Sequence, residues 1–341
     1  MRLGLFLISP QWPGRTHGEA LAESVRLAHL AEEVGLDEVW LAEHHFMSYG
    51  VCPSAITLAG HLLGATGRIG VGTAVSVLPS THPVALAEQA AMLDQLTPGR
   101  LRLGVGRGGP WRELSVLGGG EDAGRRRWEH GFAEELDVLR TALRAPAVHG
   151  PGPLVPFDEV PVVPRPAAPG GPPLHVAATS PATVAVAGTR RLPLLLGMHA
   201  GDDEKAAALA HWTEHAGTAD PDPAEHVAVG IAHVADTRVE AQRAVREALP
   251  RWLRPGLAGY VRADGAPRTP TDVDAYTDLL CRLHAVGTVD DARERLETTR
   301  ARTGIDRMAL MVQTTGDPGR TTETVTALGE LLGSRAAPAT G

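Results

Sequence analysis

The stretch that decides the expected fold, residues 43–108, reads EHHFMSYGVCPSAITLAGHLLGATGRIGVGTAVSVLPSTHPVALAEQAAMLDQLTPGRLRLGVGRG. Two short apolar runs, at 69–77 and 101–105, predict buried strands. Between and before them lie helical patterns at 84–96 and 54–66, the latter rich in alanine and glycine. An alternation of this kind is typical of parallel strands joined by crossover helices.

The same alternation extends outward to both ends of the chain. Eight strands are predicted, at residues 2–8, 38–42, 69–77, 101–105, 174–178, 193–198, 227–234 and 307–312. Each is followed by at least one helical pattern, and these include residues 19–34, 126–144, 181–190, 203–215, 238–251, 272–284 and 290–302. Eight such units favour an α/β fold of the (β/α)8 TIM-barrel class, and a doubly wound sheet is the main alternative. We expect one barrel domain over residues 1–341.

Two segments interrupt this pattern. Residues 145–173 are dense in proline and glycine, and no regular structure is expected there. An insertion carried by the barrel is favoured over a linker between domains. Residues 255–271 are predicted to form a second irregular insertion.

Composition excludes several classes of function. A chain of 341 residues can bury the core of one large barrel or of two ordinary domains. Its 43% hydrophobic and 21% charged residues are typical of a soluble globular protein. The net charge of −8 gives no electrostatic support for binding nucleic acid or an anionic membrane.

The cysteines and the N-terminal run carry no sign of export or of a metal site. Cys52 and Cys281 are the two cysteines, too far apart for a metal motif, and no disulfide framework is implied. The first apolar run is too short for a signal peptide, and no run of 18 apolar residues predicts a membrane span. We therefore expect a cytoplasmic protein without a bound metal.

The barrel prediction places the chemistry at the carboxyl ends of the strands, where barrel enzymes hold their active sites. His44 and His45 follow the second predicted strand. Neighbouring side chains on an extended chain point to opposite sides, so at most one of them faces the barrel mouth. A histidine there can exchange a proton near neutral pH. From spacing alone, two structural histidines that bond to loop carbonyls remain the simpler interpretation.

Two further turns could bind an anion. Arg107 lies in the glycine-rich run 104–109, where backbone can approach a ligand closely and arginine can grip a phosphate. Thr179, Ser180 and Pro181 open a predicted helix whose free N–H groups suit an anion, although ordinary capping explains them equally well.

With these residues in place, the chain resembles the bacterial luciferase-like flavin monooxygenases, most closely the luciferase α-type subunit. The resemblance rests on EHHF at 43–46, HLLGAT at 61–66, VGTA at 71–74, VLPSTHPV at 77–84, AEQ at 87–89, LDQ at 93–95 and a GR followed by GVGRG at 104–108. Their order and spacing match, and weaker similarity covers most of the chain.

The resemblance implies a (β/α)8 barrel that uses reduced FMN, supplied by a separate flavin reductase, and molecular oxygen. A flavin C4a-(hydro)peroxide would oxygenate a small organic substrate by hydroxylation or epoxidation. The alanine- and arginine-rich composition suggests a high-GC genome, which extends the expectation to antibiotic biosynthesis on a polyketide intermediate.

The family's functional residues carry over to matching positions. The catalytic histidine falls on His44, with His45 as its neighbour held by Glu113. The expected cofactor-binding residues are Glu43, Ala74, Val75, Arg107, Arg125, Ala178, Thr179, Thr183 and Met198, with the 74–75 peptide expected to be cis. The expected substrate-pocket residues are Trp12, Phe46, Gly106 and Trp111. Because Gly106 stands where luciferase has a reactive cysteine, neither light emission nor a long-chain aldehyde substrate is expected.

The resemblance also implies a homodimer that pairs through residues 54–66 and 84–96. Two alternative functions stay open on the same fold: a deazaflavin (F420)-dependent oxidoreductase and a non-catalytic flavin-binding protein. The EHHF string favours the monooxygenase, because relatives of the deazaflavin type tend to have a single acid-x-His version.

Overall fold

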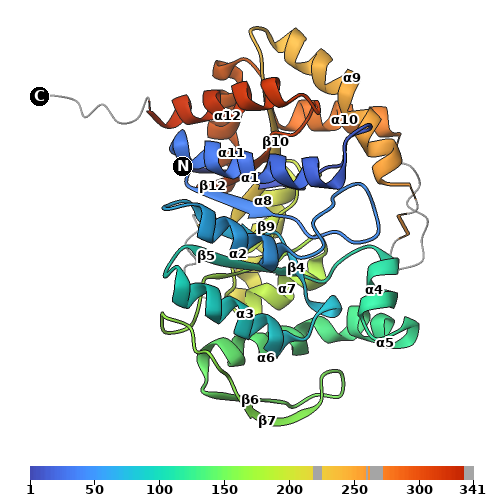
Figure 1. Ribbon diagram of the computed structural model, residues 1–341, viewed down its shortest axis with the longest axis vertical. Coiled ribbons are helices and arrows are strands. Elements are labelled where there is room, and N and C mark those ends of the chain that lie inside the picture. Colours follow the sequence, from blue (N-terminus) through green and yellow to red (C-terminus); the bar gives the residue numbers. More distant parts are fainter. Residues whose placement is uncertain (218–224, 259, 262–271, 334–341) are drawn as a thin grey trace, which may run out of the picture.

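The computed structural model describes residues 1–217, 225–258, 260–261 and 272–333, and in them a closed barrel of parallel strands (Figure 1). The barrel strands are β1 (Arg2–Leu7), β2 (Glu38–Leu41), β3 (Gly70–Thr73), β5 (Leu101–Gly106), β8 (Leu174–Ala177), β9 (Leu194–Leu196), β10 (Val227–Val234) and β12 (Arg307–Met311). They pair in this order, and β12 pairs back with β1. The predicted (β/α)8 barrel is confirmed, and closure excludes the doubly wound sheet.

Two short strands add to this ring. β4 (Ser76–Val77) pairs with the end of β5, and β11 (Ala285–Gly287) pairs with β10. The apolar run 69–77 was predicted as one strand, but it is divided into β3 and β4 at the Ala74–Val75 peptide. That peptide is cis, as the resemblance implied.

Every predicted helix is present on the outside of the barrel. They are α1 (His17–Glu33), α2 (Ala55–Ala65), α3 (Pro83–Leu96), α6 (Phe132–Arg144), α7 (Pro181–Thr189), α8 (Asp202–Ala216), α9 (Arg238–Gly256), α10 (Val273–Leu283), α11 (Val289–Thr303) and α12 (Pro318–Gly333). Hydroxyl side chains begin several of them: Thr16, Ser54 and Thr288 each accept a hydrogen bond from a backbone N–H of the first turn. None of the described helices is long and apolar enough to cross a membrane.

Two helices between β5 and the predicted helix 126–144 were not predicted, and the start of that helix is a separate π-helical turn. The two helices are α4 (Trp111–Leu117) and α5 (Glu121–Arg126), and the π-helical turn is Arg127–Gly131. Arg127 holds this region to the barrel rim, because it pairs with buried Glu135 at 2.6 Å and donates to the carbonyl of Leu78 at 3.1 Å.

The expectation of no regular structure over residues 145–173 was wrong in part. β6 (Ala147–Gly150) and β7 (Phe157–Pro161) form an antiparallel hairpin there. Pro151, Pro153 and Pro156 lie in the connecting loop, and Pro161 ends the second strand, where a missing N–H is tolerated. The second insertion was predicted from residue 255, but residues 255–256 still belong to α9. Residues 257–258 and 260–261 are also described, while 259 and 262–271 lie outside the described residues.

Glycine on β3 makes room for a tryptophan inside the barrel. Trp40, fully buried on β2, lies over Gly72, its register partner on the neighbouring strand β3. A Cβ atom on Gly72 would lie 2.7 Å from the ring atoms Cδ2 and Cζ3 of Trp40. The indole also donates from Nε1 to Glu38 at 3.0 Å, so it cannot turn away without losing that bond.

Replacing Gly72 by alanine should therefore destabilise the protein. Overpacking of this kind costs about 1–3 kcal/mol, and chemical unfolding of Gly72→Ala against the natural chain measures it. Gly18→Ala on α1 is the matched control, because a Cβ there meets only one side-chain atom, at 4.0 Å. Equal stability of both variants would contradict the packing argument.

Candidate active site

A cavity of about 290 Å³ lies at the carboxyl ends of the barrel strands. Small residues at the strand ends line its inner side: Ala42, Ala74, Ala177 and Gly197. Apolar residues Phe6, Ile8, Val75, Leu195 and Val229 also border it. The arrangement leaves a mostly apolar space above the barrel core, with a few polar groups around its edge.

His44 is one of these polar groups. Its ring meets the edge of Tyr49, with centroids 4.9 Å apart, and packs against Gly50, where a Cβ would lie 2.9 Å from Nδ1. Nδ1 is buried and has no hydrogen-bond partner among the described residues. Burial, aided by nearby His45, lowers the pKa of His44 to about 4. His44 is therefore a neutral imidazole at neutral pH.

The pKa of Glu113 is shifted in the opposite direction, upward. Its side chain is buried in the cavity wall, and burial raises its pKa to about 7. Its Oε1 accepts a hydrogen bond from the backbone N–H of His45 at 2.9 Å. Glu113 thus holds the backbone between the two histidines, and it can carry a proton near neutral pH. The imidazole of His45 is not among the cavity-lining groups.

Glu43 joins three parts of the mouth. Its carboxylate accepts N–H bonds from Val77 and from Ala55, each at 3.0 Å. Its Oε1 also lies 3.9 Å from Nε2 of His45. Because Val77 follows the cis peptide and Ala55 begins α2, Glu43 fixes the histidine turn relative to both neighbouring units.

All three tyrosines of the chain, Tyr49, Tyr260 and Tyr276, line the cavity. Tyr49 stacks on Trp252 at 4.6 Å between ring centroids. The hydroxyl of Tyr260 approaches Gly109 so closely that a Cβ there would lie 2.6 Å from it. Sequence reasoning missed this group because no local motif links the three positions.

The segment after α9 lies against the turn after β5. The carbonyl of Val261 accepts a hydrogen bond from the N–H of Trp111 at 2.7 Å. Gly109 and Pro110 line the cavity beside it, as does Leu257 at the end of α9. This contact covers one side of the cavity.

The structure brings some of the predicted residues together and leaves others outside. Those that line the cavity are Glu43, His44, Ala74, Val75, Glu113, Thr179 and Met198. Those that do not are His45, Arg107, Arg125, Ala178, Thr183, Trp12, Phe46, Gly106 and Trp111. Gly106 lies behind a lining residue, since a Cβ atom at this position would lie 2.8 Å from the side chain of Val75. Phe46 is 54% exposed, and Trp12 packs on Trp252.

The two arginines predicted to bind phosphate each lie over a tryptophan. The guanidinium carbon of Arg107 is 4.3 Å from the ring centroid of Trp128, and that of Arg125 is 4.5 Å from Trp111. Such cation–π contacts orient a guanidinium without neutralising its charge. Arg125 also lies 3.9 Å from the carboxylate of Glu121, one turn earlier on α5.

A second cavity of about 490 Å³ adjoins the first. The two share Thr179, Gly197 and His199 as lining residues. The second is bordered by the start of α7, where Ser180 caps the N–H of Thr183 at 3.4 Å, and by the inner face of α8. Its lining is mostly apolar, with His211, Glu204 and Lys205 as the charged or titratable groups on α8.

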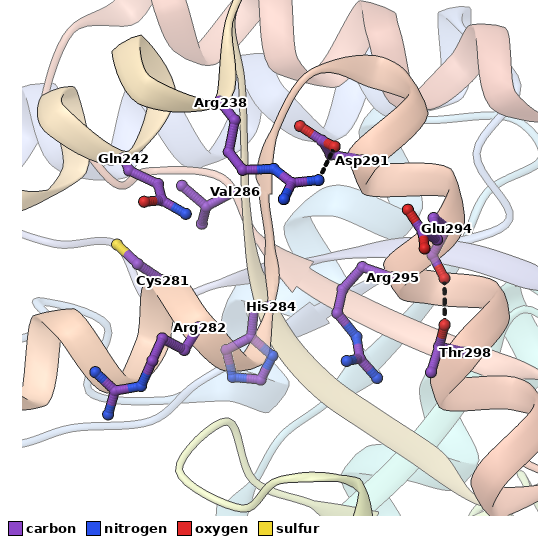
Figure 2. A pocket seen from close by; sticks show the side chains of 10 residues that line it. All are labelled: Arg238, Gln242, Cys281, Arg282, His284, Val286, Asp291, Glu294, Arg295 and Thr298. Carbon is purple, nitrogen blue, oxygen red and sulfur yellow. Dashed lines mark hydrogen bonds and ion pairs between the residues drawn. The ribbon is translucent and has the colours of Figure 1, made fainter.

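A third cavity lies between α9, α10, β11 and α11, and one of its lining residues contacts the wall of the active site. Figure 2 shows His284 between Arg282 and Arg295 in this space, which has a volume of about 290 Å³. Nε2 of His284 donates to the carbonyl of Met198 at 2.6 Å. Because Met198 lines the active-site cavity, His284 positions that part of its wall.

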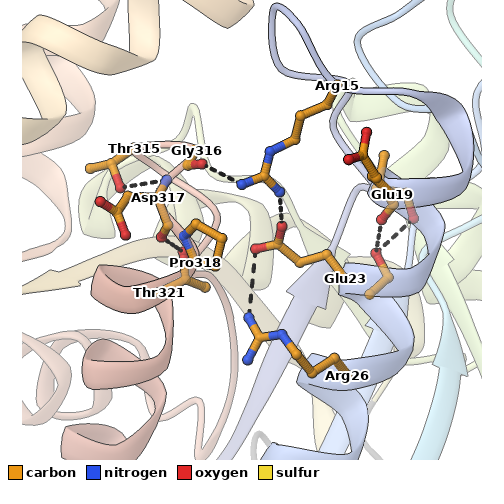
Figure 3. Close-up of polar contacts among 12 residues, drawn as sticks. Arg15, Glu19, Glu23, Arg26, Thr315, Gly316, Asp317, Pro318 and Thr321 are labelled. Carbon is orange, nitrogen blue, oxygen red and sulfur yellow. Dashed lines mark hydrogen bonds and ion pairs between the residues drawn. The ribbon is translucent and has the colours of Figure 1, made fainter.

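The rim of the mouth is also held where the last strand meets the first. Figure 3 shows Arg15 between Gly316 and Glu23. Arg15 donates to the carbonyl of Gly316 at 2.8 Å and pairs with Glu23 on α1, which also lies 3.8 Å from Arg26. This network ties the turn after β1 to the turn after β12.

Comparison with known proteins gives a consistent result. A family model described as luciferase-like monooxygenase matches residues 1–307. An alkanal monooxygenase alpha chain of Photorhabdus luminescens is 33% identical over 214 residues, which are 63% of this chain and 58% of that relative. The match therefore spans less than two thirds of the relative's length.

Solved structures are similar over nearly the whole chain. Monooxygenase RslO1 from Streptomyces bottropensis is 26% identical with a TM-score of 0.84, covering 99% of this chain and 100% of that one. The oxygenating constituent of 3,6-diketocamphane monooxygenase from Pseudomonas putida, solved in complex with FMN, is 22% identical with a TM-score of 0.76 and 97% coverage of both chains. The latter likeness shows the shared fold.

The raised pKa of Glu113 predicts a pH-dependent stability. The folded protein favours the neutral acid, so this contribution is fully present below pH 4.5 and is lost as pH rises through about 7. Glu113→Gln cannot ionise and still accepts the His45 N–H bond. Its stability relative to the natural chain should rise from pH 5 to pH 8 by at most roughly 3 kcal/mol. Denaturant unfolding at both pH values measures this, and a pH-independent difference would contradict it.

Proposed function

Because this chain belongs to the luciferase-like monooxygenase family, we propose that it is a two-component monooxygenase that uses FMNH2 and O2 to hydroxylate or epoxidise an organic substrate. The observation that carries the proposal is the mouth cavity, where a neutral His44 and a proton-holding Glu113 share one largely apolar space. A separate flavin reductase would supply the reduced cofactor.

The residues present fit a flavin. Small strand-end residues leave a broad apolar surface for a planar ring, and the buried, unpartnered Nδ1 of His44 offers a polar group beside it. The positive end of the α7 dipole favours a phosphate, while Pro181 has no N–H and the N–H of Thr183 already bonds to Ser180. We assign the ring to Glu43, Ala74, Val75 and Met198. We assign the phosphate to Arg107, Arg125, Ala178, Thr179 and Thr183.

Reduced FMN, when bound, supplies the electrons that activate oxygen, so that one oxygen atom enters the substrate and the other leaves as water. The protein handles the protons. Burial lowers the pKa of His44 and raises that of Glu113 to about 7, so near pH 7 the cavity holds a neutral imidazole and a carboxyl group that can gain or lose a proton. His44 would take up or return a proton at its imidazole, while Glu113 holds His45 in place.

The walls exclude water and favour an apolar substrate. Leu257, Tyr260 and Tyr276 cover the cavity from the side of α9 and α10. The adjoining apolar cavity offers further room, within the range of about 300–1,000 Å³ usual for small organic ligands. A polyketide intermediate is the substrate class we propose.

Reaction of the protein–FMNH2 complex with oxygen in a stopped-flow instrument tests the role of His44. In His44→Ala, the rate at which oxidised flavin absorbance returns should change by at least about tenfold, because acid–base groups contribute that much or more. His45→Ala removes an equal ring outside the cavity and should change the rate less. An unchanged rate in His44→Ala would refute the assigned role. Failure to bind FMNH2 would favour the deazaflavin alternative.

We also propose a homodimer through α2 and α3. Met92 and Leu96 on α3 are 48% and 72% exposed, and Val163, which is 70% exposed, lies beside the same helix through its N–H bond to Glu88 at 3.4 Å. Burial of such an apolar surface favours isologous pairing.

Light scattering coupled to size exclusion should give a dimer for the natural chain and a monomer for Leu96→Asp. Val239→Asp is the matched control, since Val239 is 78% exposed on α9, outside the proposed interface. A natural chain that is monomeric at micromolar concentration would overturn the interface.

A further inference from the structure

Three side chains near the end of α8 form a compact group outside the candidate active site. His211, Glu214 and His215 each offer one ligand atom, and these atoms all lie within 4.8 Å of one another. We infer that they bind one divalent transition-metal ion such as Zn²⁺. Among the residues that the structure describes, no other group of three or more His, Cys, Asp or Glu side chains lies close enough to share one ion.

The helix itself creates this proximity. Residues separated by three and four positions lie on one face of an α-helix, so His211 is next to both Glu214 and His215. The two imidazole rings lie 4.6 Å apart between centroids at an interplanar angle of 69°. Bringing the ligands onto one ion therefore needs side-chain rotation and no change of backbone.

The hydrogen bonds already present orient the imidazoles as metal sites require. Nδ1 of His215 donates to the carbonyl of His211 at 2.9 Å. A proton on Nδ1 leaves the lone pair on Nε2, and metal-binding histidines commonly make such a bond with their other nitrogen. Nδ1 of His211 lies 3.3 Å from Oε2 of Glu214, a spacing that two ligand atoms of one tetrahedral ion can take, so this nitrogen and this carboxylate can bind the ion together.

The donor set and its surroundings define the ligand class. Two imidazoles and one carboxylate suit Zn²⁺, and imidazole also suits Cu²⁺ and Ni²⁺. Three protein ligands leave one position of a tetrahedral ion open. Glu214 is 71% exposed, so the ion can enter from solvent, and His211 also lines the second cavity. The ion would therefore lie at the rim of that cavity with a free position.

Isothermal titration of the metal-free, untagged full-length protein with ZnCl2 tests the site. One equivalent should bind. His211→Ala and His215→Ala should each weaken binding at least about tenfold, and Glu214→Gln should weaken it because an amide is a poorer ligand. His130→Ala is the matched control: His130 is an exposed histidine 3.7 Å from Glu129, a pair that offers only two ligands.

A second readout separates binding from folding. Zinc should raise the melting temperature of the natural chain and of His130→Ala but not that of His215→Ala, because a ligand of the native state stabilises it. Equal melting temperatures of all variants without metal would show that the fold is intact. Absence of saturable one-to-one binding, or binding unchanged in both α8 histidine variants, would overturn the site. Neither result depends on flavin or on monooxygenase activity.

Discussion

The barrel depends on a buried ion cluster at its amino-terminal end. Glu38 on β2 pairs with Arg102 on β5 and with Arg307 on β12, and it also accepts the indole N–H of Trp40. Glu38 and Arg307 are almost fully buried, so each charge would carry a large desolvation penalty if its partner moved away. The cluster therefore penalises any slip of one strand relative to another. The register of strands on opposite sides of the barrel follows from it.

The size of the inward-facing side chains decreases from this cluster toward the mouth. Along β2, alternate residues share one face, and they run from Glu38 through Trp40 to Ala42. On β3, Gly72 leaves room for the ring of Trp40, and Ala74, which follows the strand, lines the cavity. The bulky and charged groups thus fill the lower barrel, while small ones leave space at the carboxyl ends. The cavity exists because of this gradient, and its rigid base can support a planar cofactor.

The close packing at the mouth also determines the protonation of its titratable groups. His44 and Glu113 lose water to the surrounding wall, so the pKa of the base falls and that of the acid rises. Glu43 holds the turn that carries both histidines by bonds to Val77 and Ala55. His284 holds Met198 from outside the barrel. The histidine turn is thus held by a group in the cavity wall, Glu43, and Met198 by a group outside it, His284.

The alternation of apolar runs and helical patterns, with His44 directly after the second strand, was sufficient to determine the barrel and the end at which its chemistry lies. These features follow from periodicities of burial and hydrogen bonding within a few residues, which the sequence records directly. Only the tertiary structure decided that Tyr49, Tyr260 and Tyr276 share one cavity, and that Arg107 and Arg125 lie over tryptophans. Barrel closure brings the tyrosines together from separate parts of the chain, whereas the arginine–tryptophan contacts depend on how the β5–α6 connection folds. Neither arrangement is recorded by a periodicity within a few residues.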